Sequence, residues 1–240
     1  MVFLKNLVIL IIVFATINLN AQSRNVLIFH KTAGFQHNSI TTAYQTITDL
    51  GTTNKFRVKE TNNAKIFESG ELSKYDLVMF LNTTGDVLNE NQQQYFEEYI
   101  NSGGSFFGIH SAADTEYEWK WYGRLVGAYF TDHPEIQTAE VKVLKPKHPT
   151  VSHLPGTWTR NDEWYNYRII QPDLKVLLNL EEDTYKGGNM GESHPIAWYQ
   201  DLPGGGKSVY TGGGHSIESY VEPLFVEHLL QCILFALGSE

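Results

Sequence analysis

Short runs of uninterrupted apolar residues alternate with segments of helical periodicity in the first half of the chain. The runs at residues 25–29, 76–81 and 105–109 are apolar after their first residue, as in strands that are covered on both faces. Between them, residues 39–50 and 89–100 carry apolar side chains at helical spacing. Apolar strands separated by helices form parallel sheets. The sequence therefore predicts an α/β fold with a doubly wound, mainly parallel sheet and helices on both faces.

The ends of these elements are also predicted by local signals. Gly51 is expected to end the first helix, and Asn89 is expected to cap the second. The second half is more mixed, with strands predicted at 141–144, 174–180, 196–198 and 208–210, long connections at 114–134 and 148–168, and a closing helix at 223–237. Since no linker, repeat or low-complexity stretch interrupts it, residues 22–240 are predicted to form one domain.

The first 21 residues have the pattern of a signal peptide. Lys5 precedes an apolar run at 7–14, a polar stretch follows, and Ala21 is a small residue suited to cleavage. The run is short for a membrane span, so no stable membrane insertion is expected after cleavage, although an uncleaved anchor is the alternative. The mature protein is therefore expected to be periplasmic or secreted.

Composition excludes several classes of function. The formal net charge is −9, and no run of Lys or Arg is long enough to follow a phosphate backbone, so a nucleic-acid partner is not expected. A neutral or cationic small ligand fits better. Cys232 is the single cysteine and lies in an apolar run, which predicts a buried thiol and excludes an intramolecular disulfide or a zinc site built from cysteines. Nine histidines remain as candidates for chemistry.

Polar residues follow four of the predicted strands at their carboxyl ends. These residues include His37, Asn82, His110 and His215. Ligands of open α/β sheets bind beyond these strand ends, so we expect the four side chains to share one crevice. His110 lies at a strand-to-turn junction resembling a nucleophile elbow, where it can act as an acid, a base or a metal ligand. A serine hydrolase using Ser111 is an alternative, but no Gly-x-Ser-x-Gly motif is present.

Residues 162–165 place two carboxylates beside two aromatic rings. Sugar subsites use this composition, but a solvated turn with core aromatic residues has it too. Combining this segment with the strand ends gives three sets of candidate site residues. The acid/base candidates are His110, Asp114 and Glu163; the binding candidates are His37, Asn82, His133, His194 and His215; the sugar platforms are Trp121, Trp164 and Trp198.

A metal site is an alternative that the sequence leaves open. No His-Glu-x-x-His or other compact ligand spacing occurs. Zinc or another divalent metal could still be bound by histidines and carboxylates from distant loops, giving a metal-dependent hydrolase. Aromatic rings and carboxylates equally suit a non-catalytic sugar-binding module. The leading hypothesis is an exported enzyme that binds a small carbohydrate and uses His/carboxylate acid–base chemistry.

Several ordered motifs resemble one known family. The matching segments are GFQHNSI (34–40), GGSFFGIHSAADT (103–115), LVGAYF (125–130) with His133-Pro134, His148-Pro149, Leu154-Pro155, DEWY (162–165), HPIAW (194–198) and GGGH (212–215). The chain resembles the ThuA-like (trehalose utilisation) family of the class I glutamine amidotransferase-like superfamily. Gln36 and His194 depart from this pattern, because the family usually has Arg at the first position and often at the second.

The resemblance implies a flavodoxin-like sheet and a role in carbohydrate utilisation. It also implies that His110 occupies the position of the amidotransferase cysteine, so glutamine hydrolysis by a cysteine is excluded. The implied substrate is a glycoside or keto-sugar, such as trehalose or its keto derivative, and the reaction would be of the hydrolase or lyase type. The resemblance leaves open whether the chain forms a homo-oligomer.

Overall fold

The computed structural model describes residues 23–68 and 70–238, so the predicted signal peptide lies outside the described residues. The strands are β1 (Arg24–Phe29), β2 (Phe56–Thr61), β3 (Leu77–Leu81), β4 (Ser105–Ile109), β5 (Tyr129–Asp132), β6 (Gln137–Val143), β7 (Thr157–Asp162), β8 (Asn166–Arg168), β9 (Lys175–Glu181), β10 (Pro195–Asp201) and β11 (Lys207–Thr211). The α-helices are α1 (Ile40–Asn54), α2 (Glu90–Asn101), α3 (Lys120–Val126) and α4 (Pro223–Ala236), and the short 3₁₀ helices include η3 (His110–Asp114) and η5 (Ile217–Val221).

One large sheet has the strand order β2-β1-β3-β4-β11-β10-β9-β6-β7. Its first five strands are parallel, which confirms the predicted α/β fold with a parallel core. From β11 onward the neighbours are antiparallel, so the sheet is mixed. The difference follows from the connections, because a parallel neighbour needs a long crossover whereas β10 and β11 are joined by a short turn.

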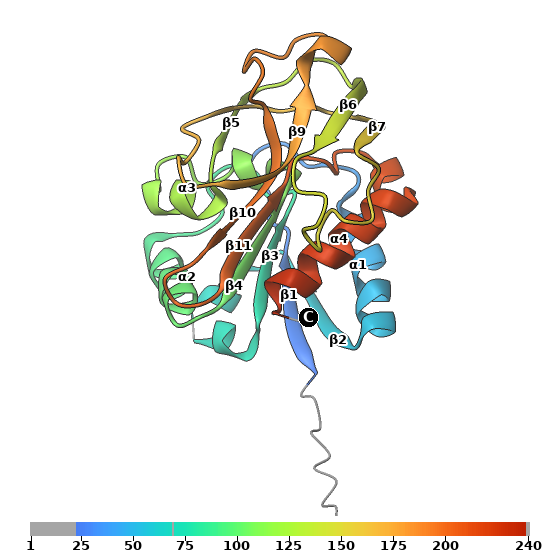
Figure 1. Ribbon diagram of the computed structural model, residues 1–240. Helices are drawn as coiled ribbons and strands as arrows, with labels where there is room; N and C mark the ends of the chain where they lie inside the picture. The colour runs from blue at the N-terminus through green and yellow to red at the C-terminus, as the bar shows by residue number, and fades with distance from the viewer. Residues whose placement is uncertain (1–22, 69, 239–240) are drawn as a thin grey trace, which may run out of the picture.

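Helices cover both faces of the parallel core, with α1 and α4 on one face and α2 and α3 on the other (Figure 1). Every residue of β3 and β4 is buried, as the continuous apolar runs predict. Cys232 on α4 is buried as well, which confirms the predicted core thiol. Asn89 caps α2 through a capping box with Gln92, as predicted. Among the described residues, no helix is both long and apolar enough to cross a membrane.

Gly51 does not end the first helix, so that prediction is wrong. The helix α1 continues to Asn54, and Lys55 takes the left-handed conformation at its C-cap with φ of 63°. Gly51 is needed inside the helix because α1 lies close to β2. A Cβ there would lie 2.8 Å from the carbonyl oxygen of Phe56 and 2.9 Å from Cγ2 of Val58. Close helix–strand packing, not helix termination, accounts for this glycine.

We therefore expect Gly51→Ala to lower the free energy of unfolding by about 1–3 kcal/mol, despite the higher helix propensity of alanine. Thr52→Ala is the matched control, because Thr52 lies next in the same helix on its exposed side. The control should change stability by less than about 0.5 kcal/mol. Urea unfolding of both variants measures the difference, and equal stabilities would contradict the packing explanation.

The two long connections contain regular structure that was not predicted. Residues 114–134 include α3 and β5, and residues 148–168 include β7 and β8. The short strands β5 and β8 pair with each other in a separate antiparallel sheet. Strand β5 also packs against η3, the turn that follows β4. These connections therefore bring side chains to the carboxyl end of the parallel core.

Candidate metal centre

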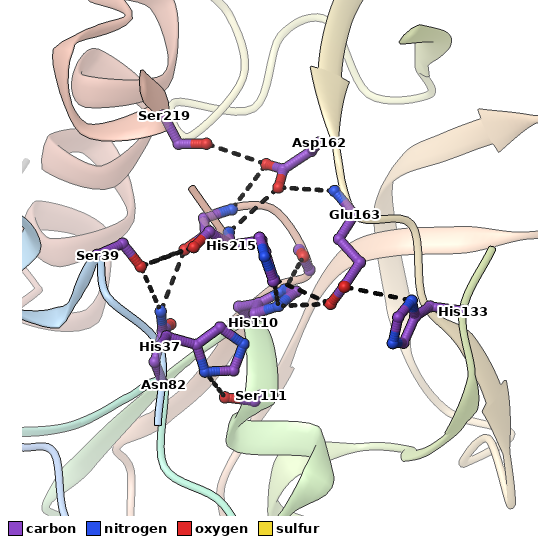
Figure 2. Close-up of polar contacts among 12 residues, drawn as sticks. His37, Ser39, Asn82, His110, Ser111, His133, Asp162, Glu163, His215 and Ser219 are labelled. Carbon is purple, nitrogen blue, oxygen red and sulfur yellow. Dashed lines mark hydrogen bonds and ion pairs between the residues drawn. The ribbon is translucent and has the colours of Figure 1, made fainter. Parts of the chain in front are cut away.

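Four buried or half-buried side chains meet at the carboxyl ends of the strands (Figure 2). His37 follows β1, His110 follows β4, His215 follows β11, and Glu163 follows β7. One ligand atom from each residue lies within 4.8 Å of the corresponding atoms of the other three. The predicted crevice thus brings together three of the histidines and one of the carboxylates. We refer to these four residues as the His₃Glu group.

His110 is held in this group by its backbone and by its ring. Its φ is +50°, in the left-handed region, so the strand-to-turn junction is strained, as expected for a turn that resembles a nucleophile elbow. Nδ1 lies 2.9 Å from the carbonyl oxygen of Gly212, to which it donates a hydrogen bond. In the neutral ring the proton is therefore on Nδ1, and the lone pair of Nε2 faces Glu163 and His215.

The distances between donor atoms suit a single ion. Oε2 of Glu163 lies 3.0 Å from Nδ1 of His215 and 3.3 Å from Nε2 of His110. The two ring nitrogens are 3.3 Å apart. Ligand atoms around a tetrahedral ion with bonds of about 2.0–2.1 Å lie about 3.3 Å from one another. The three atoms therefore have the separations that a divalent ion of this kind requires.

His37 completes the group as a neutral imidazole. Burial, together with the neighbouring His110 and His215, lowers the pKa of His37 to about 3. Nδ1 lies 3.4 Å from Oγ of Ser111, and the other ring nitrogen faces the group (Figure 2). A neutral ring has a free lone pair at neutral pH, which is the form that binds metals.

Asp162 holds the backbone of the group in place. Its Oδ1 accepts hydrogen bonds from the backbone nitrogens of Glu163 (2.9 Å) and His215 (3.1 Å). Its Oδ2 accepts from Arg160 (2.8 Å), from the nitrogen of Gly214 (2.8 Å) and from the Ser219 hydroxyl (3.1 Å). Every partner of this fully buried carboxylate is a donor. One charged side chain therefore fixes the positions of two members of the group.

Both acidic residues are ionised in the folded protein. Burial alone would raise the pKa of Glu163, but the close approach of the His110 and His215 ring nitrogens to its carboxylate holds this pKa well below its usual value. Burial also opposes ionisation of Asp162, but the Arg160 guanidinium, His110 and the backbone hydrogen bonds together outweigh it, so the pKa of Asp162 is lowered. The His₃Glu group thus offers one carboxylate and three imidazoles, a donor set that suits zinc and other divalent transition metals. The residues present fit such an ion.

Aromatic rings and one further histidine surround the group. The Tyr165 ring lies 4.2 Å from the His110 ring and 4.2 Å from the Phe130 ring, between centroids. Nδ1 of His133 lies 3.2 Å from Oε1 of Glu163, and 42% of the His133 side chain is exposed, so this residue faces the open side. Phe35 lies beside His37 and is exposed. It was not predicted, although its position two residues before His37 in a strand-end loop could have indicated it.

Two of the three tryptophans predicted as sugar platforms do not fill that role. Trp164 and Trp198 are buried, at 1% and 0% exposure, and their indole nitrogens donate to main-chain oxygens of Gln137 and Val126. Trp121 stacks on Trp119 at a centroid distance of 5.0 Å, among the aromatic residues that pack beside α2. Neither buried ring offers a free face, so the predictions for Trp164 and Trp198 are corrected: these two rings serve packing.

Two of the predicted binding residues support the site instead. His194 is fully buried behind Tyr165, whose carbonyl oxygen lies 2.8 Å from its Nε2, and Glu182 lies 2.7 Å from its Nδ1. Asn82 is also fully buried, and its amide donates to Oγ of Ser39 and to the carbonyl oxygen of Gly214, both at 3.1 Å. Both side chains are enclosed and hold neighbouring segments of the site through these hydrogen bonds.

Asp114 lies at the edge of the site, half-buried, and accepts a hydrogen bond of 2.5 Å from the Tyr117 hydroxyl. Burial raises the pKa of Asp114, although the nearby His110 and His133 oppose the shift. It is therefore a carboxylate close to the His₃Glu group but outside it.

Comparison with known proteins identifies the family. Residues 25–236 match the family model described as ThuA, trehalose utilisation. The chain belongs to the ThuA family. No curated protein matches this ThuA chain. Among solved structures, a ThuA-like protein from Bacteroides uniformis is 20% identical, with a TM-score of 0.76 over 93% of this chain and 95% of that one.

Two further structures place the ThuA chain in a wider fold group. The glutaminase domain of Trypanosoma brucei CTPS is 9% identical, with a TM-score of 0.52 over 90% of this chain and 95% of that one. α-L-Fucosidase isoenzyme 2 from Paenibacillus thiaminolyticus is 14% identical, with a TM-score of 0.58 over 90% of this chain and 33% of that one. At these identities the likeness concerns the fold, and it confirms the predicted class I glutamine amidotransferase-like architecture.

Proposed function

We propose that this ThuA chain is a divalent-metal-dependent enzyme that acts on a carbohydrate. The observation that carries the proposal is the His₃Glu group, whose four ligand atoms lie within 4.8 Å of one another in a buried setting. The trehalose-utilisation family supports a sugar as the substrate. A domain of the same fold within an α-L-fucosidase adds support for a carbohydrate setting.

Different residues of the chain would hold the ion and transfer a proton. His37, His110, His215 and Glu163 would hold the ion, which would polarise a carbonyl or hydroxyl oxygen of the sugar. Asp162 keeps Glu163 and His215 oriented through their backbone nitrogens.

Proton transfer is assigned to Asp114 because it is the predicted acid/base carboxylate that lies outside the His₃Glu group. The Tyr117 hydroxyl fixes its orientation at the edge of the site. Its burial favours the protonated form and so brings its pKa nearer to neutral pH, which suits general acid–base catalysis. In this arrangement the group that binds the ion and the group that moves the proton are different side chains. The substrate we propose is a glycoside or keto-sugar such as trehalose or its keto derivative.

Metal content tests the proposal directly. We expect the purified protein, incubated with Zn²⁺, Mn²⁺, Co²⁺ or Ni²⁺ and then desalted, to retain about one ion per chain by elemental analysis. A chelator should abolish turnover of a panel of glycosides and keto-disaccharides, and adding back the ion should restore it.

A matched pair of variants makes this test specific. Glu163→Gln removes the charged ligand and should lose the ion. His30→Ala should keep it, because His30 pairs with Glu60 at 2.7 Å and does not belong to the His₃Glu group. Failure to retain any of these ions, or full activity in the presence of chelator, would refute the proposed metal dependence.

A further inference from the structure

Phe35 presents an aromatic ring to solvent directly beside the His₃Glu group. It is 65% exposed, although the other aromatic side chains in the described part of the chain are buried or half-buried. Its ring lies 4.9 Å from the His37 ring in an edge-to-face arrangement. It is also nearly parallel to the His215 ring, with the ring centroids 6.5 Å apart and an angle of 15° between the ring planes. The exposed face therefore lies next to two members of the group.

The backbone that carries this ring is anchored by Thr84, a buried residue. Its Oγ1 donates to the carbonyl oxygen of Phe35 at 2.8 Å and accepts from the nitrogen of Gly34 at 3.2 Å. Its own carbonyl oxygen accepts from the nitrogen of Ala33 at 2.7 Å. A fixed backbone limits the freedom that the ring would lose when a ligand stacks on it. An exposed ring on a backbone held in this way is suited to stacking against a ligand.

The polar groups beside Phe35 are imidazoles and a carboxylate, which can form hydrogen bonds with the hydroxyl groups of a sugar. The ion pairs of Glu163 are all with histidines, namely His110, His133 and His215. A sugar ring has an apolar face of C–H groups that packs on an aromatic ring, while its hydroxyls remain free to reach the polar group beside it. Phe35 and the His₃Glu group together provide these two kinds of contact.

We propose that Phe35 is the platform on which the apolar face of a neutral sugar ring stacks beside the metal centre, so that this residue sets the affinity for the sugar. The choice of a sugar as the ligand rests on the proposed function. The role predicted for three tryptophans thus belongs to a phenylalanine in the loop after β1. Phe35 is a binding residue in this proposal and takes no part in proton transfer or in holding the ion.

Calorimetric titration with trehalose, sucrose, maltose and methyl α-glucoside tests the platform. Phe35→Ala should raise the Kd of the sugars that bind by about tenfold, whereas Phe35→Trp should keep the Kd within about threefold of the wild-type value. With Phe35→Trp, sugar binding should also change the tryptophan fluorescence. Val221→Ala is the control. Val221 is an apolar residue of similar exposure, at 68%, but it has no aromatic ring and lies at the end of η5.

Metal analysis of the same samples separates this inference from the proposed function. The expected result is an unchanged metal content in Phe35→Ala together with weaker sugar binding. Unchanged sugar affinity in Phe35→Ala, or no binding of any of these sugars by the wild type, would overturn the platform. A protein that binds sugar through Phe35 but retains no ion would instead refute the metal-dependent function and leave the platform standing.

Discussion

Asp162→Asn is expected to lower the free energy of unfolding by about 3–5 kcal/mol. The carboxylate is fully buried and accepts hydrogen bonds from five donors, including the Arg160 guanidinium. An asparagine of the same shape would remove one of the carboxylates that pair with the buried guanidinium, the other being Glu222, and would turn an NH₂ group toward other donors. Urea unfolding monitored by circular dichroism measures the loss.

Asp201→Asn is the control for this prediction. Asp201 also pairs with two basic side chains, Lys175 and Lys207, but its side chain is 52% exposed. Its replacement should cost no more than about 1 kcal/mol, because solvent screens exposed ion pairs. Similar losses of stability for the two variants would show that the buried Asp162 carboxylate stabilises the fold no more than the exposed Asp201 carboxylate does. Any folded Asp162→Asn protein should also bind metal about 10–100-fold more weakly.

His110→Asn is expected to lower kcat/KM on the responsive sugar by roughly 10³-fold or more, because a bound metal ion is worth several kcal/mol to such a reaction. Asparagine tolerates the left-handed backbone at this position better than most residues do. It is too short to place a nitrogen where Nε2 of His110 meets Glu163 and His215. The variant should therefore stay folded and lose the ion.

Elemental analysis and steady-state kinetics check this prediction, and thermal unfolding confirms that the variant is folded. His30→Ala should behave as the wild type in all three measurements, because it removes a histidine that is not in the His₃Glu group. A folded His110→Asn protein with normal metal content and normal activity would contradict the assignment of His110 as a ligand.

The positions of three members of the His₃Glu group could be predicted from local pattern. His37, His110 and His215 each follow an apolar strand, and carboxyl ends of parallel strands share one edge of the sheet. Glu163 was a candidate because of its aromatic neighbours, but its approach to the histidines could not be derived. It follows β7, the last strand at the antiparallel side of the sheet, and the turn after that strand carries it back to the group.

Aromatic residues show why other predictions failed. Composition marks Trp164, Trp198 and Phe35 equally as rings that could stack on a sugar. The difference lies in exposure, since the two tryptophans are enclosed by the core and Phe35 is 65% exposed. Enclosure depends on segments far apart in the chain, such as the main-chain oxygen of Val126 that accepts a hydrogen bond from Trp198. No local pattern contains that information.

The sequence by itself determined the parallel core, the burial of Cys232 and the strand ends that carry the histidines. These features depend on hydrophobic periodicity and on the fixed direction of parallel strands, both of which are local. The tertiary structure alone decided that Glu163 joins three histidines within the reach of one ion and that Asp162 orients Glu163 and His215. Such contacts bring together residues up to 178 positions apart, from His37 to His215, and only the folded chain sets their distances.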